Sequence, residues 1–587
     1  MSMRSSPKTD IGTVLVHLVL IVSFVVALGT GLRIASDDPD AAWLSILDPI
    51  LPMEHLWFRH LIAGVAMTGA LAGYAVYVVR ARLAARIRFD ISRAKAIWRG
   101  GQTGVSALNV VVVWFLLLGL TFETVTGAAI FLDDAGQTLI ALHHWVSWLC
   151  LACVVAHVGL HVTYGGARYA LKIFRPGRLR IAPPPPDLAE LLAEELRRRT
   201  APPVDHDASS SLQEPSLRAH PLATAVAVAL MVAGIACGSE TLTRPALTVV
   251  AIPKSEAPIV DGDVSDPVWS KARPVTVTAT QGGDFGGTHQ SRIEIRALHD
   301  GEFAYFVFTW DDPTRSLKHH PLVKTQDGWR VASSRPDLVD EDVYHEDKFA
   351  VLLSPSAFPI IGAAIHLSVR PLQGKPAGST GRGLHYTLDG SILDVWQWRA
   401  THEGADGHID NCHFGGPREA SAVAPTAPYS GGFALDPGPR RYEKNVAGGT
   451  ASAAIHPRRL PKDLVAMTQA MGRMSDATNE SESENARWWM SVAESVPFTT
   501  EGDATIPVGT VIPGVLVLEK PHKDKNEIIG FGRWAAGRWT LEVVRRLKTD
   551  STYDVELKTG VLMWVAAFDH SEKRHARHLR PFRLKVE

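Results

Sequence analysis

Four histidines lie within one apolar stretch of the chain, residues 139–164. At about 1.5 Å per residue, a helix of this length can cross a bilayer. Ionisable side chains at membrane depth are costly, so histidines there indicate a function. His143 and His157 are 14 positions apart, which places them on one helix face about 21 Å apart along the axis. Neutral imidazole is a good axial ligand for haem iron, so the pair suits two stacked haems. The alternative is buried or interfacial histidines with polar partners.

The chain that must position these histidines divides into an apolar part and a polar part. It has 587 residues, enough for several domains, and its formal net charge of -1 gives no argument for nucleic-acid binding. Four cysteines are too few for a disulfide framework, and Cys150 with Cys153 is more simply explained by helix packing. Five apolar runs can span a membrane: 11–34, 57–79, 104–132, 139–164 and 220–238.

The charges of the loops predict the orientation of these runs. Residues 80–101 carry seven Lys or Arg against one Asp, so this loop is expected in the cytoplasm. Residues 35–55 carry five Asp or Glu and no Lys or Arg, so this loop is expected outside. The fifth run then carries the chain outward. We therefore expect a multi-pass protein of the bacterial inner membrane with a periplasmic C-terminal domain.

Histidines in the other runs match those of the fourth in depth. His17 lies on the cytoplasmic side of the first run and His60 on the outer side of the second. Depth pairs His17 with His157, and His60 with His143, which predicts two bis-histidine haem b sites in a four-helix core plus a fifth helix. Three further histidines are expected at the interface or behind the ligands: His55, His144 and His161.

This part of the chain, about residues 8–176, resembles the bacterial di-haem cytochrome b family of formate dehydrogenase gamma subunits and hydrogenase cytochromes b. The resemblance is carried by His17 followed by Thr30-Gly31-Leu32, by Arg59-His60, and by Thr126-Gly127. It implies two b haems that carry electrons between quinone and a partner. His161 is the alternative to His157 as a ligand.

The resemblance fails at one position. Trp98-Arg99-Gly100-Gly101-Gln102 stands where formate dehydrogenase subunits have Tyr-Asn-Ala-Gly-Gln, whose Asn helps to hold quinone. Asn109 is a candidate substitute, with a packing role as its alternative.

The rest of the chain reads as a linker and an all-β sandwich. After a membrane domain at 1–180, the proline-rich residues 181–219 are expected to form a cytoplasmic linker before the fifth helix at 220–238. Residues 247–587 contain alternating runs bounded by Gly, Asp and Pro, which predict a β-sandwich. The clearest runs are 292–298, 304–310, 348–354, 539–547 and 561–568. Residues 405–455 are expected to form a long surface loop.

The opening of this domain, from Ile259 to Trp269, resembles the entry of family-nine carbohydrate-binding modules and DOMON-like domains. Later motifs, including Trp310-Asp311-Asp312-Pro313-Thr314 and Asp347-Lys348-Phe349, complete a set similar to the haem-binding domain of ethylbenzene dehydrogenase gamma subunits. That resemblance implies one further b haem in the outer domain.

The ligands of this outer haem are less defined by the sequence. The gamma subunits use Met and Lys, a pair with no clear counterpart here. His366 with His578 is the favoured pair, and His385 follows; surface hydrogen bonding is the alternative role for His385 and for His575. Three methionines are expected to pack within an insert: Met467, Met471 and Met474. Trp396 and Trp398 share one strand face, which indicates core or haem-wall packing rather than sugar stacking.

These observations favour a membrane-bound b-type cytochrome. It would transfer electrons between the quinone pool and a periplasmic redox partner through two membrane haems and one outer haem, as the electron-transfer component of a respiratory oxidoreductase rather than a self-contained enzyme. One alternative is a haem-free, carbohydrate-module-like domain on a cytochrome anchor or sensor. Another is a terminal reductase that acts on a metal ion or small oxidant at the outer haem.

Overall fold

The structure is a computed structural model of the full chain. It describes the following residues: 9–36, 43–44, 46–47, 49–52, 56–132, 136–177, 220–280, 282, 284–332, 344–355, 386–387, 389–402, 407–419, 431–438, 440–448, 454–472, 482, 486–518, 528–572 and 574–587. The predicted linker at 181–219 lies outside these residues.

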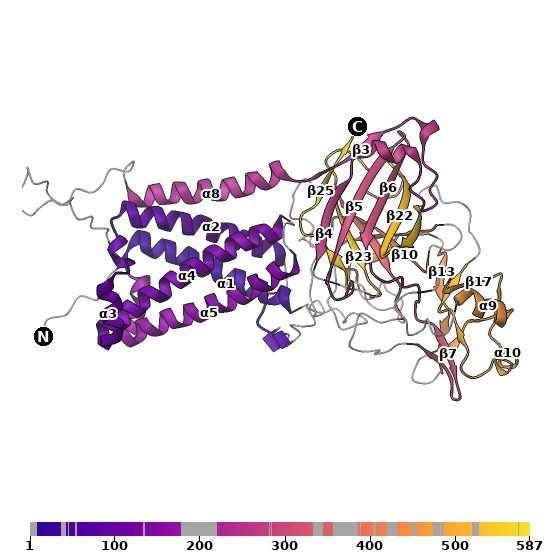
Figure 1. Ribbon diagram of the computed structural model, residues 1–587, viewed down its shortest axis with the longest axis horizontal. Coiled ribbons are helices and arrows are strands. Elements are labelled where there is room, and N and C mark those ends of the chain that lie inside the picture. Colours follow the sequence, from indigo (N-terminus) through magenta and orange to yellow (C-terminus); the bar gives the residue numbers. More distant parts are fainter. Residues whose placement is uncertain are drawn as a thin grey trace, which may run out of the picture. The chain divides into compact units, whose positions relative to one another are not determined.

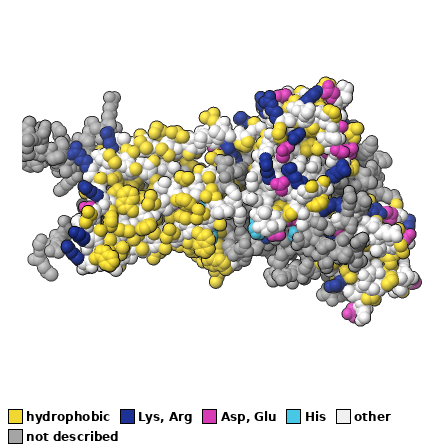
Figure 2. Space-filling view, viewed as in Figure 1, with side chains coloured by type: hydrophobic (Ala, Val, Ile, Leu, Met, Phe, Trp, Pro, Cys, Tyr) yellow, Lys and Arg dark blue, Asp and Glu magenta, His cyan; other side chains and the backbone are white. Residues whose placement is uncertain are grey.

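Five long apolar helices cover the five predicted spans (Figure 1). They are α1 (Ile11–Ala35), α2 (Leu56–Arg80), α4 (Gly101–Phe131), α5 (Gln137–Gly165) and α8 (Pro221–Thr243). Hydrophobic side chains cover the visible face of these helices in Figure 2, and Val25, Leu118 and Val155 are 60%, 63% and 65% exposed. Such a surface is stable only in lipid, so the chain is a multi-pass membrane protein.

Short elements complete the helical part. They are β1 (Thr9–Asp10), the 3-10 helix η2 (Ala84–Arg86), α3 (Ile91–Arg99), α6 (Ala167–Ala170), the 3-10 helix η3 (Leu171–Phe174) and β2 (Pro176–Gly177). Asp10 caps α1 by accepting a hydrogen bond from the Thr13 N–H at 2.9 Å. The same carboxylate accepts from the Tyr77 hydroxyl at 2.5 Å and from Arg86 at 2.8 Å. One carboxylate therefore ties the start of α1 to the end of α2 and the basic loop.

The fifth helix packs on α2 through two glycines. A Cβ at Gly69 would lie 2.8 Å from the carbonyl oxygen of Ala229, and one at Gly73 would lie 2.9 Å from that of Ala225. These distances are too short for any side chain larger than hydrogen. Small residues four positions apart let two membrane helices approach to backbone contact, where dispersion holds them together.

The outer part is built on a 13-stranded sheet that curls into two packed layers (Figure 1). Its strands follow the order β12-β11-β10-β9-β23-β24-β4-β5-β6-β22-β21, and β25 and β3 connect β23 to β5. The bounds are β3 (Ala246–Ala251), β4 (Val275–Thr280), β5 (Gln290–His299), β6 (Phe303–Asp311), β9 (Lys348–Ser354), β10 (Leu393–Arg399), β11 (Asp410–Phe414), β12 (Phe433–Leu435), β21 (Ile529–Ala535), β22 (Arg538–Arg546), β23 (Leu562–Phe568), β24 (Ala576–Arg577) and β25 (Phe582–Val586). All five predicted strand runs are confirmed.

Aromatic side chains from both layers fill the space between them. Trp310 of β6 packs on Phe349 of β9 and Trp398 of β10, with ring centroids 4.7 and 5.8 Å apart. Phe306 packs on Trp396 at 5.6 Å. Trp396 and Trp398 are 2% and 1% exposed, so they belong to the core and present no platform for a sugar. The predicted β-sandwich is confirmed.

Smaller elements accompany the sandwich. The strands are β7 (Leu322–Thr325), β8 (Gly328–Val331), β13 (Tyr442–Lys444), β14 (Val446–Ala447), β15 (His456–Pro457), β16 (Arg459–Pro461), β17 (Trp489–Ser491), β18 (Ser495–Pro497), β19 (Val511–Ile512) and β20 (Val515–Val517). The helices are η5 (Lys254–Glu256), η6 (Pro267–Lys271), α9 (Leu464–Met471) and α10 (Thr500–Ala504). Met467 and Met471 are buried in the core, as predicted for insert packing, and Met474 lies outside the described residues.

The prediction of one long loop over 405–455 is wrong. β11 lies in this region and pairs with β10 along its whole length, and β12 pairs with β11. Cys412 of β11 is fully buried against the sandwich. The Gly- and Pro-rich composition around β11 hides a five-residue strand whose register is set by β10 and not by its own sequence.

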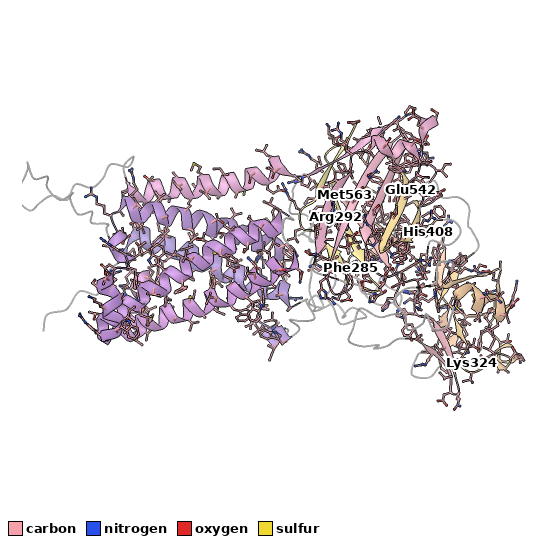
Figure 3. The ribbon with its side chains drawn as sticks, in the orientation of Figure 1. Phe285, Arg292, Lys324, His408, Glu542 and Met563 are labelled. Carbon is pink, nitrogen blue, oxygen red and sulfur yellow. The ribbon has the colours of Figure 1, made fainter. Side chains whose placement is uncertain are left out.

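The Ile259–Trp269 motif folds around a buried carboxylate, Glu542 of β22 (Figure 3). Glu542 is fully buried and accepts hydrogen bonds from the backbone N–H groups of Asp261 and Gly262, each at 3.1 Å. It also accepts from Trp269 Nε1 at 2.8 Å. The motif is therefore structural, because three donors depend on one acceptor.

Replacing this acceptor should destabilise the outer domain. Glu542→Ala leaves three donors without their partner, and we expect a loss of about 2–5 kcal/mol in the free energy of unfolding. Denaturation followed by tryptophan fluorescence measures it. The matched variant Glu556→Ala removes an exposed carboxylate that pairs with Lys558, and it should leave the transition unchanged. Equal transitions for the two variants would contradict the role of Glu542.

Candidate functional site

His60 of α2 and His143 of α5 lie side by side in the helical part. Their ring centroids are 6.3 Å apart and their planes are inclined at 72°. A first-row metal binds imidazole nitrogen at about 2 Å, so two imidazoles on opposite sides of one iron have centroids about 6.4 Å apart. The pair therefore fits the two axial positions of a haem.

Threonines orient both rings. His60 Nδ1 lies 3.0 Å from Thr30 Oγ1 and 3.1 Å from the carbonyl oxygen of Ala27, and His143 Nδ1 lies 2.8 Å from Thr126 Oγ1. Each threonine donates its own proton to a carbonyl one turn earlier in its helix, at 2.6 and 2.8 Å. The hydroxyl oxygen is thus an acceptor, Nδ1 carries the proton, and Nε2 keeps a free lone pair for a metal.

The glycine after each threonine makes room beside the rings. A Cβ at Gly31 would lie 3.2 Å from the His60 ring, and a Cβ at Gly127 would lie 3.4 Å from the His143 ring. A side chain at either position would press on an imidazole that the preceding threonine already fixes. The two Thr-Gly dipeptides therefore serve the same purpose on α1 and α4, namely to hold one ring each.

A buried carboxylate adds to this site. Glu123 of α4 places Oε2 3.1 Å from His143 Nδ1, and its side chain is 9% exposed. A carboxylate on the Nδ1–H of a ligating histidine raises the basicity of the ligand. We did not single out Glu123 from the sequence. Its signal was an acidic residue inside the apolar run 104–132, which is costly unless it serves a function.

A second group of histidines, His17, His157 and His161, also lies in the helical part. His17 Nδ1 lies 2.9 Å from the carbonyl oxygen of Thr13, which leaves Nε2 free. His17 is within electrostatic range of both His157 and His161, whose rings are 4.6 Å apart. Asn109 Nδ2 lies 3.5 Å from His161 Nε2. Asn109 thus competes for the Nε2 of His161, whereas the Nδ1 of His157 is buried and makes no hydrogen bond among the described residues.

The remaining histidines of the membrane part are not gathered into these pairs. His144 accepts a hydrogen bond from Trp148 Nε1 at 3.2 Å within its own helix, which suits the predicted interfacial role. His55 lies outside the described residues.

The three histidines predicted to bind the third haem are not brought together among the described residues. His366 and His385 lie outside the described residues. His578 is 4% exposed, its Nε2 accepts from the Val565 N–H at 3.0 Å, and its Nδ1 lies 2.8 Å from the carbonyl oxygen of Arg580. Both ring nitrogens are therefore used by the backbone, which argues against an axial role for His578.

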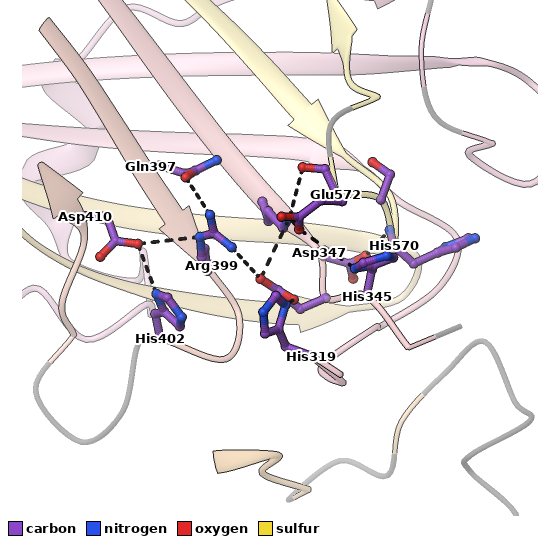
Figure 4. Close-up of polar contacts among 12 residues, drawn as sticks. His319, His345, Asp347, Gln397, Arg399, His402, Asp410, His570 and Glu572 are labelled. Atoms are coloured by element: carbon purple, nitrogen blue, oxygen red, sulfur yellow. Dashed lines mark hydrogen bonds and ion pairs between the residues drawn. The ribbon is translucent and has the colours of Figure 1, made fainter. Parts of the chain in front are cut away.

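A charged cluster near the start of β9 was missed by sequence reasoning (Figure 4). Glu346 is fully buried and contacts His319 Nδ1 at 2.6 Å and Arg399 at 3.3 Å. Burial acts to raise the pKa of Glu346, but His319, Lys348 and Arg399 together hold it well below its usual range. Lys348 pairs with Glu572 at 2.9 Å. The available signal was the dense run His345-Glu346-Asp347-Lys348 directly before a strand.

Asp347, the first residue of the Asp-Lys-Phe motif, has a structural role. It accepts hydrogen bonds from the Ser316 N–H at 2.7 Å, from Trp539 Nε1 at 3.0 Å and from the His570 N–H at 3.0 Å. Burial and the neighbouring Asp569 carboxylate raise the pKa of Asp347 to about 7. The motif thus joins three segments at one end of the sandwich.

Comparison with known proteins agrees with this division. The family model described as ethylbenzene dehydrogenase matches residues 266–580, which is more than half of the chain. The chain therefore belongs to the ethylbenzene dehydrogenase family. The family model described as prokaryotic cytochrome b561 matches residues 8–177. The protein is accordingly a membrane cytochrome that binds b-type haem and transfers electrons, and its family membership points to a redox partner such as a dehydrogenase subunit.

Solved structures add only weak likenesses. A family 9 carbohydrate-binding module from Caldicellulosiruptor kristjanssonii, in complex with glucose, is 8% identical over 58% of this chain and 95% of its own, with a TM-score of 0.21. A putative carbohydrate-binding protein from Bacteroides uniformis is 8% identical over 59% of this chain and 100% of its own, with a TM-score of 0.23. At these scores the likeness carries no argument. No curated protein matched the chain.

The carboxylate beside His143 should affect a haem potential. Glu123→Gln keeps the shape of the side chain but replaces its carboxyl group by an amide, which is a weaker acceptor for His143 Nδ1–H, so the midpoint potential of one haem should rise by tens of millivolts. A spectroelectrochemical titration measures the shift. Glu240→Gln in α8 is the matched control. Identical midpoint potentials in both variants would show that Glu123 does not influence the haem.

Proposed function

We propose that the protein carries electrons across the bacterial inner membrane between the quinone pool and a periplasmic redox partner. The observation that supports this most directly is the His60–His143 pair, whose ring centroids are 6.3 Å apart and whose Nδ1 atoms are both occupied. The Nε2 atoms of such a pair are available to bind iron, because they make no hydrogen bond among the described residues.

Two haems b would lie in the membrane part in this proposal. His60 and His143 would hold the outer one, and His17 and His157 would hold the inner one. The haem supplies one-electron chemistry when bound. The chain fixes the imidazoles through Thr30 and Thr126, raises the basicity of one of them through Glu123, and excludes water with its apolar helices.

The outer domain would hold one further haem b. The basis is the ordered set of motifs shared with the ethylbenzene dehydrogenase gamma subunits. We assign its ligands to the segment that contains His366 and His385, because the hydrogen bonds of His578 leave it no free nitrogen. The basic loop at 80–101 supports a periplasmic location for this domain, and the Lys and Arg side chains gather at one end of the helical part in Figure 2.

Haem content tests the membrane sites. A pyridine haemochrome assay on the full chain in detergent should give about three b haems per polypeptide, one per proposed site. His143→Ala and His157→Ala should each remove one, whereas the control His144→Ala should remove none. Full haem content in both ligand variants would refute the sites. A value of about two in the wild-type chain would leave the outer domain without haem.

Quinone reactivity tests the membrane reactant. Asn109 Oδ1 is buried and makes no hydrogen bond among the described residues, so it could accept one from a quinol hydroxyl. In vesicles, Asn109→Ala should raise the KM for a ubiquinol analogue by about tenfold while haem content stays unchanged. Arg99→Ala, at the exposed position where relatives have Asn, is the comparison variant. An unchanged KM for the quinol in Asn109→Ala would show that Asn109 does not contact quinone.

A further inference from the structure

Three imidazoles that none of the predicted sites uses lie together in the outer domain. His319 and His320 follow β6, and His345 precedes β9. Ring centroids are 4.7 Å apart for His319 and His320, 4.6 Å for His320 and His345, and 6.3 Å for His319 and His345. One ring nitrogen of each lies within 4.8 Å of those of the other two. Nitrogens this close can share one metal ion.

The three distances distinguish between coordination geometries. Imidazoles on a tetrahedral ion would have centroids about 5.2 Å apart in every pair, whereas on a tetragonal ion adjacent rings are about 4.5 Å apart and opposite rings about 6.4 Å apart. The observed set has two short distances and one long one. On a tetragonal ion His319 and His345 would take opposite positions, and His320 would take the position between them.

This arrangement is incompatible with a haem on the same pair. A porphyrin fills the plane between two opposite axial ligands. His320 occupies that plane, with its centroid 4.7 and 4.6 Å from those of the two opposite rings. A bare ion, in contrast, needs a ligand there.

Neighbouring groups prepare the nitrogens for a cation. Glu346 accepts the Nδ1–H of His319, which leaves His319 Nε2 free. The Nδ1 atoms of His320 and His345 are buried and make no hydrogen bond among the described residues. Neutral imidazole is the form that binds metals.

The backbone holds the cluster in place. His320 has a φ of 47°, a left-handed conformation that is unusual for a residue with a side chain. Its N–H donates to the carbonyl oxygen of Tyr344 at 2.9 Å, which joins the two segments that supply the histidines. A Cβ at Gly514 would lie 2.1 Å from the carbonyl oxygen of His320, so only glycine lets this turn sit where it does. Strain of this kind is typical of sites that must be preformed.

We propose that His319, His320 and His345 form a binding site for one copper(II) ion. Copper(II) is the divalent first-row ion that combines a preference for imidazole with tetragonal coordination and high affinity. Three of the four equatorial positions are supplied by the histidines, and the fourth is left for solvent or a small anionic ligand. The proposal is independent of the membrane haems.

Copper binding by the full chain tests the site. The purified protein in detergent is stripped with a chelator, given one equivalent of Cu²⁺, desalted, and analysed for copper, for haem and by electron paramagnetic resonance. We expect about one copper per chain, with an axial signal split by nitrogen nuclei. His320→Gln and His345→Gln should each weaken binding by about tenfold or more. His456→Gln, which alters a histidine stacked on Phe498 and not among the three grouped imidazoles, should bind like the wild type.

Haem content and circular dichroism of each variant establish that it is folded. His320 is only half-buried and its Nδ1 makes no hydrogen bond in the described part, so His320→Gln should retain the native spectrum. Copper that is absent from the folded wild type, or that binds equally in the folded variants, would overturn the proposal. Loss of one haem in the variants would also overturn it, because the histidines would then be haem ligands.

Discussion

An imidazole that is to bind iron inside a membrane must meet two demands at once. Its Nδ1–H needs an acceptor, because a buried donor without one is costly, and its Nε2 must have no other partner. Helices in lipid offer few spare acceptors, since their carbonyls are already used within the helix. The threonines of α1 and α4 solve this by giving their proton to their own helix and presenting their oxygen to the histidine of a neighbour. Thr30 thus joins α1 to α2, and Thr126 joins α4 to α5.

A carboxylate serves the same end in both parts of the chain. Glu123 contacts His143 in the helical part, and Glu346 contacts His319 in the sandwich. The surroundings differ. Glu346 is balanced by Lys348 and Arg399, whereas Glu123 lies on an apolar helix. The contact of Glu123 with its imidazole therefore lies in the less polar surroundings of the two.

The sequence was sufficient for features with a long or repeated pattern. The apolar runs predicted all five membrane helices, and alternation predicted the principal strands. Helix periodicity and depth predicted that His60 and His143 lie close together. Prediction from the sequence failed where segments that are distant in the chain meet through irregular backbone. The cluster of His319, His320 and His345 depends on a turn fixed by Gly514, and the backbone bonds of His578 depend on the registry of β23. Neither the cluster nor these hydrogen bonds leave a periodic pattern in the sequence.

The contact between α2 and α8 has a consequence for the helical part of the chain. At Gly69 and Gly73 the two helices meet through backbone atoms, with no room for a methyl group. Hydrophobic burial does not drive such a contact, because lipid is as apolar as the helices. The contact depends on dispersion, which weakens steeply as the helices move apart. The contact between α2 and α8 is therefore most sensitive to added volume at these two glycines, where one methyl group would force the backbones apart.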